Sequence, residues 1–514
     1  MTSAHRALAV PGLLISIFGS STGRDLNNLA LVCSSWKELA LDIKWRTSTV
    51  PLTVFLKRMA EFYRQELNTF RRNIYKDGAL ELSDEDWSNI QRYAQKVTRI
   101  RVDLNLSLRS VAMIRRKTAT TNQKLCPNLI YLEYEDLGLD SVEEGWDVDG
   151  TLAILAGPQL RILSVTGNKH VDADTIHRLE IVAGISPHIT AIVVTPQVDD
   201  FPDYTIFKAL RQLCVKGVVW WREWEVISSC PLLEVLEIGD WSGMIDEQGE
   251  DGRTDFFFPK VELLFVEPDP WDKIGAVQLI SASSMPKLQS IQLTVHHQAA
   301  HAQLLQHLRK TFPLLQSLHV ETNEFRFKPS VHAGDALKFA AIRKLVLETN
   351  FFNDAMLEQI GSSLPELREF HIGSPLTSCN TKASTCGLIS LSMCCRSLEH
   401  LSISVSDPSI PNGRTPSYPK NRAHKLQRLR FYHLGIGDKA FKGFVDWLAA
   451  FCPNVRYLEV NCLSLGCHPS ISKEKIDRFV ENVFKARQSQ MLESMLLCDV
   501  HPGVLSTSTS GNAP

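Results

Sequence analysis

One short phrase recurs along most of this chain: an apolar residue, two further residues, an apolar residue, one further residue, and a third apolar residue. Alternation of this kind is typical of a strand with one buried face. A unit this small cannot bury its own apolar face, so consecutive units must stack on one another. Fifteen copies recur at a mean spacing of about 28 residues, beginning at Val97, Leu129, Leu160, Ile189, Leu210, Leu233, Val261, Leu288, Leu315, Ile342, Leu367, Leu398, Leu426, Val455 and Leu492.

Proline marks the start of many copies. Proline has no N–H group and ends a preceding helix, which suits the entry to a short strand. Nine copies carry it two residues before the first apolar position, at Pro127, Pro158, Pro187, Pro231, Pro259, Pro286, Pro313, Pro365 and Pro453. The spacers predict helices: Leu357, Ile360 and Leu364 follow Asp354 at helical spacing, and residues 441–451 do the same after Asp438.

Asparagine completes the pattern in four copies. Asn105, Asn168, Asn323 and Asn350 lie three residues after the third apolar position, where the side chain can bond to the backbone of a turn. With this residue and this period, the phrase resembles the leucine-rich repeat. The resemblance covers about residues 96–500 and implies a solenoid with a parallel inner sheet and outer helices. The predicted fold class is therefore α/β, with a short all-α segment in front of the solenoid.

A second motif lies in front of the repeat, within residues 10–46. Its apolar residues recur at helical spacing: Pro11, Leu13, Leu14, Ile17 and Phe18, then Leu26, Leu29, Val32, Cys33 and Trp36. They resemble the F-box, the helical motif that docks on the Skp adaptor of a Skp–cullin–F-box ubiquitin ligase. Trp45-Arg46 is similar to the tail of many fungal members. The resemblance implies that these ten residues bind the adaptor, through an apolar surface of a kind normally buried against a partner helix.

The motif departs from the family pattern at two places. Gly12 stands where the family usually has glutamate, and Ser20-Ser21-Thr22 replaces the apolar residue that follows Ile-Phe. Glycine inside a helix costs about 1 kcal/mol relative to alanine, so we expect a weakened first helix and weaker docking. The alternative is that residues 8–45 serve only as a helical cap on the exposed end of the solenoid.

Composition narrows the class of protein. Lys and Arg number 55 against 57 Asp and Glu, a formal net charge of -2, so no general attraction to nucleic acid or a membrane surface is expected. Twelve cysteines in 514 residues are too sparse for a disulfide framework, which favours reduced thiols in an intracellular protein, cytoplasmic or nuclear. A secretory signal in residues 1–20 is the alternative, but Pro11 interrupts its apolar run.

No set of residues typical of catalysis or metal binding is complete. His297 and His301 have the spacing of a zinc-protease helix, yet Gln298 replaces the glutamate base and no third ligand follows. Cys379 and Cys386 form no C-x-x-C ligand pair with their neighbours. We therefore predict a protein that is not an enzyme, with no catalytic residue, cofactor or metal.

The inner face of the predicted solenoid offers a second surface. Residues between the buried apolar positions point into the concavity, because side chains alternate along a strand. These positions are acidic with interleaved histidine in the middle and basic toward the C-terminal end, so we expect a basic segment of a target on the middle strands. The predicted substrate-binding residues are Glu237, Glu267, His319, Glu321, Glu348, Glu369, His371, His400, Arg428, Arg430 and Tyr432.

The sequence predicts four segments and one function. Residues 1–48 form a helical docking module, 49–95 a helical connector, 96–500 the solenoid and 501–514 a disordered tail. The F-box resemblance implies a substrate-recognition subunit of a ubiquitin ligase, which holds the Skp-type adaptor, and through it a cullin, while the solenoid captures a protein to be ubiquitinated. The alternative is a leucine-rich-repeat scaffold with no ubiquitin role.

Overall fold

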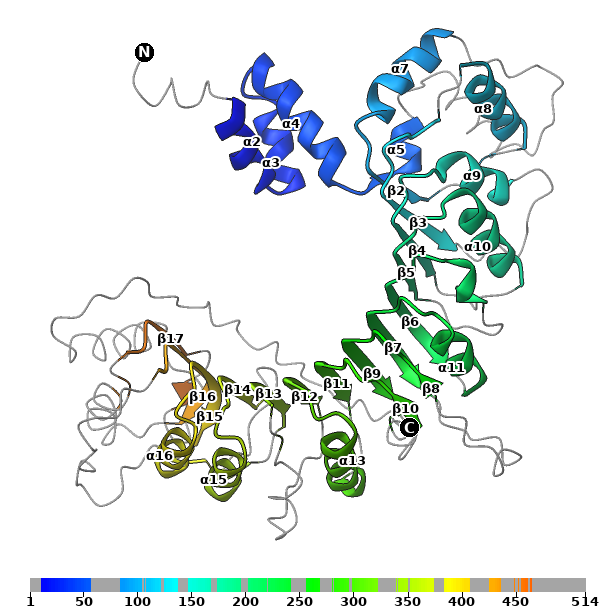
Figure 1. Cartoon of the computed structure of the whole chain (residues 1–514). Coiled ribbons are helices and arrows are strands. Elements are labelled where there is room, and N and C mark those ends of the chain that lie inside the picture. The colour runs from blue at the N-terminus through cyan, green and yellow to red at the C-terminus, as the bar shows by residue number, and fades with distance from the viewer. Residues whose placement is uncertain are drawn as a thin grey trace, which may run out of the picture. The chain divides into compact units, whose positions relative to one another are not determined.

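A computed structural model describes the structured part of the chain. The described residues are 11–56, 84–103, 106, 108–121, 124–136, 147–167, 173–195, 202–219, 221–241, 256–268, 280, 282–294, 298–321, 339, 341–349, 352–373, 383–406, 425–435, 448, 452, 454–460 and 463–464. The chain divides into two compact units, Met1–Val261 and Glu262–Pro514. In each unit, parallel strands lie beside one another with helices along one side of the sheet (Figure 1).

The first unit begins with helices and continues as a parallel sheet. Its helices are α2 (Pro11–Gly19), α3 (Gly23–Leu29), α4 (Ser34–Thr47), α5 (Leu52–Leu56), α7 (Asp84–Ala94), α8 (Leu108–Thr121), α9 (Val148–Leu155), α10 (Ala173–Ile185), the 3-10 turn η1 (Tyr204–Ile206) and α11 (Trp221–Ser228). Its sheet runs in chain order through β1 (Val50–Pro51), β2 (Arg99–Val102), β3 (Tyr131–Asp136), β4 (Ile162–Gly167), β5 (Ala191–Val194), β6 (Gln212–Val219) and β7 (Val235–Trp241), and β8 (Phe256–Phe257) follows.

The second unit repeats this plan. Its sheet runs through β9 (Leu263–Pro268), β11 (Ser290–Thr294), β12 (Ser317–Glu321), β13 (Lys344–Glu348), β14 (Glu369–Ile372), β15 (His400–Val405), β16 (Arg428–Gly435) and β17 (Tyr457–Val460), and β18 (Leu463–Ser464) pairs with β16. The short strand β10 (Ser283–Ser284) and helices α13 (Gln298–Thr311), α15 (Asp354–Ser363) and α16 (Thr385–Cys394) complete it. Every repeat phrase from Val97 to Val455 coincides with a strand, and the phrase at Leu492 lies outside the described residues.

Register explains why the repeat phrase specifies this sheet. Leu318 pairs with Leu345, Leu345 with Phe370 and Phe370 with Leu401, so the central apolar residue of each phrase meets its equivalent on the next strand. These side chains are almost completely buried against the helices. A slip of one residue would place them all on the open face, which holds each strand in register. The predicted α/β fold class is confirmed, with helices in front of a long parallel sheet that is consistent with a solenoid.

The helix predicted after Asp354 is present, and Asp354 is its first residue rather than its N-cap. Asn353, not Asp354, is the N-cap residue of α15, and its side chain accepts a hydrogen bond from Met356 N at 3.0 Å. The carboxylate of Asp354 instead accepts from Ser384 N at 2.7 Å and Ser384 Oγ at 2.6 Å. Since Ser384 is the N-cap residue of α16, Asp354 joins the starts of two consecutive helices.

We expect Asp354→Ala to lower the free energy of unfolding of the second unit by about 1–3 kcal/mol, because the substitution leaves two half-buried donors of Ser384 unpaired. Asp354→Asn, which keeps one acceptor oxygen, should cost less. Urea unfolding followed by fluorescence measures the loss. Glu358→Ala, an exposed change on the same helix, is the matched control. Equal losses for Asp354→Ala and Glu358→Ala would contradict the assigned role.

The structure adds one strand that was not predicted and leaves several other predictions untested. Strand β1 was not predicted, because two residues that include a proline carry no alternating pattern; it pairs Val50 with Ile100 ahead of the first repeat. The four asparagines of the repeat pattern and most of the helix expected at residues 441–451 lie outside the described residues. The boundaries at residues 48, 95 and 500, and the leucine-rich-repeat identity of the units, stay predictions.

Candidate protein-docking surfaces

The N-terminal module, defined as helices α2, α3 and α4, has a small core of its own. Leu14 and Phe18 lie four residues apart, which turns both side chains to the same side of α2. Phe18 packs edge-on against Trp36 of α4, with ring centroids 5.4 Å apart. The residues buried together in this core are Leu14, Phe18, Leu26, Ala40 and Ile43, with Leu29, Ala30, Trp36 and Leu39 packed against them.

The Ser-Ser-Thr segment, where the sequence departs from the family pattern, forms the turn between two helices. Ser20 Oγ and Ser21 Oγ donate to the Ile17 carbonyl at 2.8 and 3.0 Å. Thr22 is the N-cap residue of α3, and it forms a capping box with Asp25. Helix α2 forms over Pro11–Gly19 with Gly12 inside it. The expectation that these departures weaken docking stays a prediction.

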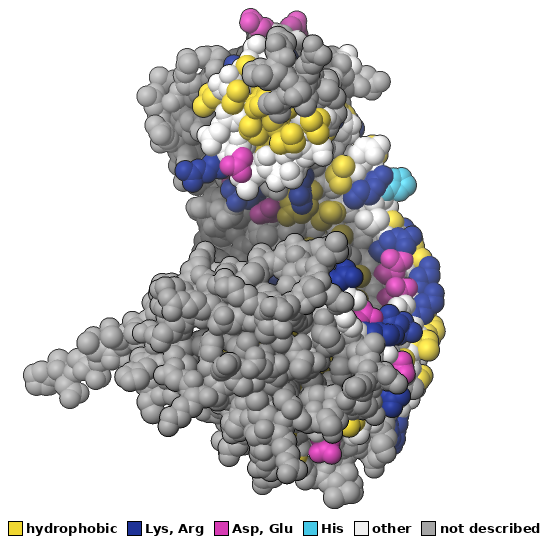
Figure 2. All heavy atoms as spheres, turned by 90° about the vertical axis from the view of Figure 1, so that its left-hand side faces the viewer, with side chains coloured by type: hydrophobic (Ala, Val, Ile, Leu, Met, Phe, Trp, Pro, Cys, Tyr) yellow, Lys and Arg dark blue, Asp and Glu magenta, His cyan; other side chains and the backbone are white. Residues whose placement is uncertain are grey.

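Five large aliphatic side chains of the module are exposed rather than buried. Their exposed fractions are 43% for Leu13, 51% for Ile15, 41% for Ile17, 85% for Leu31 and 60% for Val32. Figure 2 shows hydrophobic side chains gathered over the module at the top of the view. We call these five residues the apolar surface of the module. Several large exposed apolar side chains on so small a unit are typical of a protein-interaction site.

The ten residues predicted to bind the adaptor include a group that is buried in the core of the module and a group that is exposed. The side chains of Leu14, Phe18 and Leu26 form the core of the module, and Leu29 and Trp36 pack on that core, so these five are placed to support the surface rather than to line it. Leu13, Ile17, Val32 and Cys33 are exposed. The side chain of Pro11 lies outside the described structure. Whether the exposed residues bind an adaptor stays a prediction.

Sequence reasoning missed Ile15 and Leu31, two members of the apolar surface. Leu31 lies in the turn between α3 and α4, where its N–H donates to the Asn28 carbonyl at 3.0 Å. Helical spacing predicts nothing for a turn residue. The available signal was the apolar run Ala30–Cys33, which is too long for a short turn between two helices to bury.

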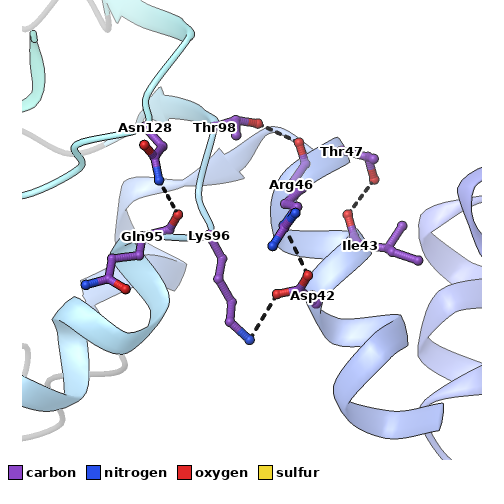
Figure 3. A network of polar contacts seen from close by, with 8 residues as sticks. All are labelled: Asp42, Ile43, Arg46, Thr47, Gln95, Lys96, Thr98 and Asn128. Atoms are coloured by element: carbon purple, nitrogen blue, oxygen red, sulfur yellow. Dashed lines mark hydrogen bonds and ion pairs between the residues drawn. The ribbon is translucent and has the colours of Figure 1, made fainter. Parts of the chain in front are cut away.

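The C-terminal turn of α4 contacts the first end of the sheet (Figure 3). Asp42 Oδ1 lies 3.0 Å from Lys96 Nζ, and Thr98 Oγ1 donates to the Arg46 carbonyl at 2.5 Å. Trp45 is buried, and its ring lies 5.6 Å from that of Tyr93 in α7. Helix α4 therefore contributes to two structures, the core of the module and the first end of the sheet.

The inner face of the second unit, defined as the strand side chains opposite the buried apolar ones on β9–β17, carries paired charges. Glu348 Oε1 lies 3.1 Å from His319 Nε2. Glu369 lies 3.1 Å from Lys344 Nζ and 3.4 Å from His400 Nδ1. Partial burial raises the pKa of the Glu369 carboxyl, but the hydrogen bond and charge of Lys344, with the nearby histidines, outweigh burial and hold that pKa below its ordinary value.

The C-terminal end of this face combines arginine and tyrosine. The Arg428 guanidinium lies over the Tyr457 ring, 4.9 Å from its centroid, and Arg430 lies 5.2 Å from the centroid of Tyr432. Arg430 Nη2 also forms an ion pair with Glu459 Oε1 at 3.0 Å. Stacking on an aromatic ring holds a guanidinium close to the sheet while leaving its N–H groups able to donate.

The structure brings most of the predicted substrate-binding residues onto one face. His319, Glu321, Glu348, Glu369, His371, His400, Arg428, Arg430 and Tyr432 lie on neighbouring strands of the second unit, Glu267 is exposed on β9, and Glu237 lies on β7 of the first unit. Sequence reasoning missed Ser402, whose Oγ lies 2.8 Å from His371 Nδ1. The strand register could have indicated this residue, because Ser402 lies directly between His371 and Arg430. Substrate binding by this face stays a prediction.

We expect the second unit to lose stability as the pH falls from 7.5 to 5.5. Burial first, then the charge of Lys344, lowers the pKa of His371, whose other charged neighbours are Glu369, His400 and Arg430. Burial also lowers the pKa of His307 and His433. A histidine with a depressed folded pKa gives stability that is present above its unfolded pKa of about 6.5 and is lost as the pH falls through the folded pKa.

Urea midpoints measured across this pH range test that expectation. His371→Gln should flatten the dependence, and His188→Gln, at an exposed histidine of the first unit, should leave it unchanged. A midpoint that holds constant or rises toward pH 5.5 would contradict the prediction.

The described cysteines carry free thiols: Cys33, Cys126, Cys214, Cys230, Cys386, Cys394, Cys395 and Cys452. Burial raises the pKa of Cys395 to about 12. The hydrogen bond between Cys33 Sγ and Ser35 Oγ, at 3.2 Å, lowers the pKa of the exposed Cys33. Among the residues that the structure describes, no three His, Cys, Asp or Glu side chains are arranged to hold a metal; His297 and Cys379 lie outside them.

Within the described ranges, none of the helices combines the length and the apolar character that crossing a bilayer requires.

Comparison with known proteins assigns a family to the front of the chain. Residues 11–50 match the F-box-like family model, so the chain carries an F-box-like domain that coincides with the N-terminal module. No curated protein matches the chain. Among solved structures, the chain is similar to the crystal structure of the Rad7 and Elc1 complex in yeast, with 15% sequence identity and a TM-score of 0.30 over 64% of this chain and 85% of that chain.

Proposed function

We propose that this chain is a substrate-recognition subunit of a Skp–cullin–F-box ubiquitin ligase. The observation that carries the proposal is the apolar surface of the F-box-like domain, where Leu31 and Val32 are 85% and 60% exposed. Leaving such side chains in water is unfavourable, and covering them with an apolar partner helix removes that cost. The partner is a Skp-type adaptor, which links the chain to a cullin inside the cell.

The two ends of the chain then have different roles. The F-box-like domain holds the adaptor, and the inner face of the repeat sheet captures a protein target. The chain itself is not an enzyme in this scheme. It contributes by holding lysines of the target close to the ubiquitin-carrying enzyme, which raises their effective concentration.

A scaffold without a ubiquitin role is the second candidate, and one observation favours it. Trp45 and Asp42 at the end of α4 contact Tyr93 of α7 and Lys96 just before β2, as residues of a cap would. Such a cap does not account for the exposure of Leu31 and Val32 in the turn that precedes α4. The ligase proposal accounts for both ends.

Co-expression of the full chain with a Skp-type adaptor tests the proposal directly. We expect a stable complex of one chain with one adaptor on size-exclusion chromatography, and recruitment of a cullin when it is added. Elution of a folded chain separately from the adaptor would rule out the proposal and leave the scaffold. Circular dichroism of the free chain establishes that it is folded.

A further inference from the structure

Two carboxylates lie side by side on the inner face of the second unit. Glu321 of β12 and Glu348 of β13 are register partners on adjacent parallel strands. Like charges placed directly opposite each other destabilise a strand pair. Their closest polar partners are uncharged or weakly basic: Thr294 Oγ1 lies 3.5 Å from Glu321, and His319 Nε2 lies 3.1 Å from Glu348. In the described part of the chain, neither carboxylate has a lysine or arginine partner.

Positive charge gathers at the C-terminal end of the same face and on the segments that lead into its last strands. Arg428 on β16, Lys425 just before β16 and Arg456 just before β17 are all exposed. Glu459, the carboxylate on the neighbouring strand, is already paired with Arg430. Within the described ranges, none of the three exposed cations has an acidic partner. Stacking on Tyr457 holds the Arg428 guanidinium in place, which reduces the entropy it would lose on binding an anion.

On the strands between these two sites, the charged side chains pair with one another. Lys344, Glu369 and His400 satisfy one another, and His371 is bound to Ser402. A ligand gains little electrostatic energy there, because it would have to displace existing partners. Within the middle strands, these pairs leave Glu321 and Glu348 as the carboxylates best placed for the basic segment expected from the sequence. The face presents an acidic pair at β12–β13 and a basic site at its C-terminal end, β16–β17.

We propose that this face binds an extended protein segment that places a cationic side chain between Glu321 and Glu348 and an anionic side chain at Arg428. The proposal rests on the proposed function for the identity of the ligand as a target protein. Strands about 4.8 Å apart, with a rise of about 3.3 Å per residue, place the acidic pair and Arg428 roughly 20 Å apart. An extended chain covers that distance in about six residues. The target is thus recognised by a lysine or arginine and an aspartate or glutamate at that separation.

A randomised peptide display library, selected against the full chain, tests this rule. We expect enriched peptides to carry one basic and one acidic residue about six positions apart. The charge reversal Glu321→Lys with Glu348→Lys should weaken a selected peptide at least tenfold, and exchanging the basic residue of the peptide for glutamate should restore binding. Arg428→Glu should require the reverse exchange at the acidic residue.

Matched controls are available on the outer helices. Glu358→Lys on α15 and Lys310→Glu on α13 change exposed charges in the same way and should leave peptide affinity unchanged. Restored binding by the exchanged peptides also shows that the reversed variants are folded. Enriched peptides of one charge sign only, a library that yields no binder, or reversal variants that behave like the helix controls would each overturn the inference.

The adaptor measurement separates this inference from the proposed function. A failed charge rule with intact adaptor binding removes only the inference. If peptides are selected by charge as expected but the adaptor does not bind, the ubiquitin role is ruled out. The chain is then an interaction protein that recognises charged segments.

Discussion

The full chain carrying Leu31→Asp and Val32→Asp is expected to lose at least about 100-fold in affinity for a Skp-type adaptor while remaining folded. Both side chains are largely exposed in the free chain, so aspartate costs the folded chain little. In the complex the same positions are covered, and a buried carboxylate without a partner is strongly unfavourable. Isothermal titration with the purified adaptor measures the loss.

Two controls make this result specific. Leu314→Asp alters a side chain that is 58% exposed in the second unit, and adaptor affinity should not change. Leu26→Ala removes a core side chain that is 1% exposed, and it should lower adaptor binding by destabilising the module, with a loss of helical signal that the surface variant does not show. If the surface variant binds the adaptor as the unaltered chain does, the apolar surface is not the docking site.

The repeat sheet could be predicted from sequence because one local pattern specifies both burial and register. Each phrase places its central apolar residue next to its equivalent on the next strand, as Leu345 lies next to Leu318. The N-terminal module could be predicted only as a set of apolar positions. Helical spacing cannot tell Leu14, which is buried, from Ile17, which is exposed, because the division depends on how α2 packs against α4. The turn residue Leu31 lies beyond any periodic pattern.

The sequence predicts which residues lie on the inner face, but not which of their charges are paired. Alternation along a strand predicts that Glu348 and Glu369 point to the open side. Which neighbours neutralise them depends on side-chain reach across strands: Lys344 contacts Glu369 on β14, whereas among the described residues Glu321 contacts the hydroxyl of Thr294. These contacts distinguish a uniformly acidic face from one with an acidic site and a separate basic site.

Helix α4 predicts a second large effect, at its other end. Trp45→Ala should weaken the packing of α4 on the first end of the sheet by about 3–5 kcal/mol, because it removes a buried indole that lies against Tyr93. Hydrogen exchange at the amides of β2, from Arg99 to Val102, should accelerate accordingly. The adaptor should still bind, since Trp45 lies at the opposite end of α4 from Leu31 and Val32.

Trp36→Ala is the informative comparison, because Trp36 lies on the same helix but packs on Phe18 in the core of the module. It should reduce adaptor affinity and leave exchange at β2 unchanged. The two tryptophans thus separate the two candidate roles of the front helices. If Trp45→Ala abolished adaptor binding as completely as Trp36→Ala, docking and capping would be one property of α4. If each variant affects only its own end, the helix serves as the link that sets the orientation of a bound adaptor relative to the first repeats.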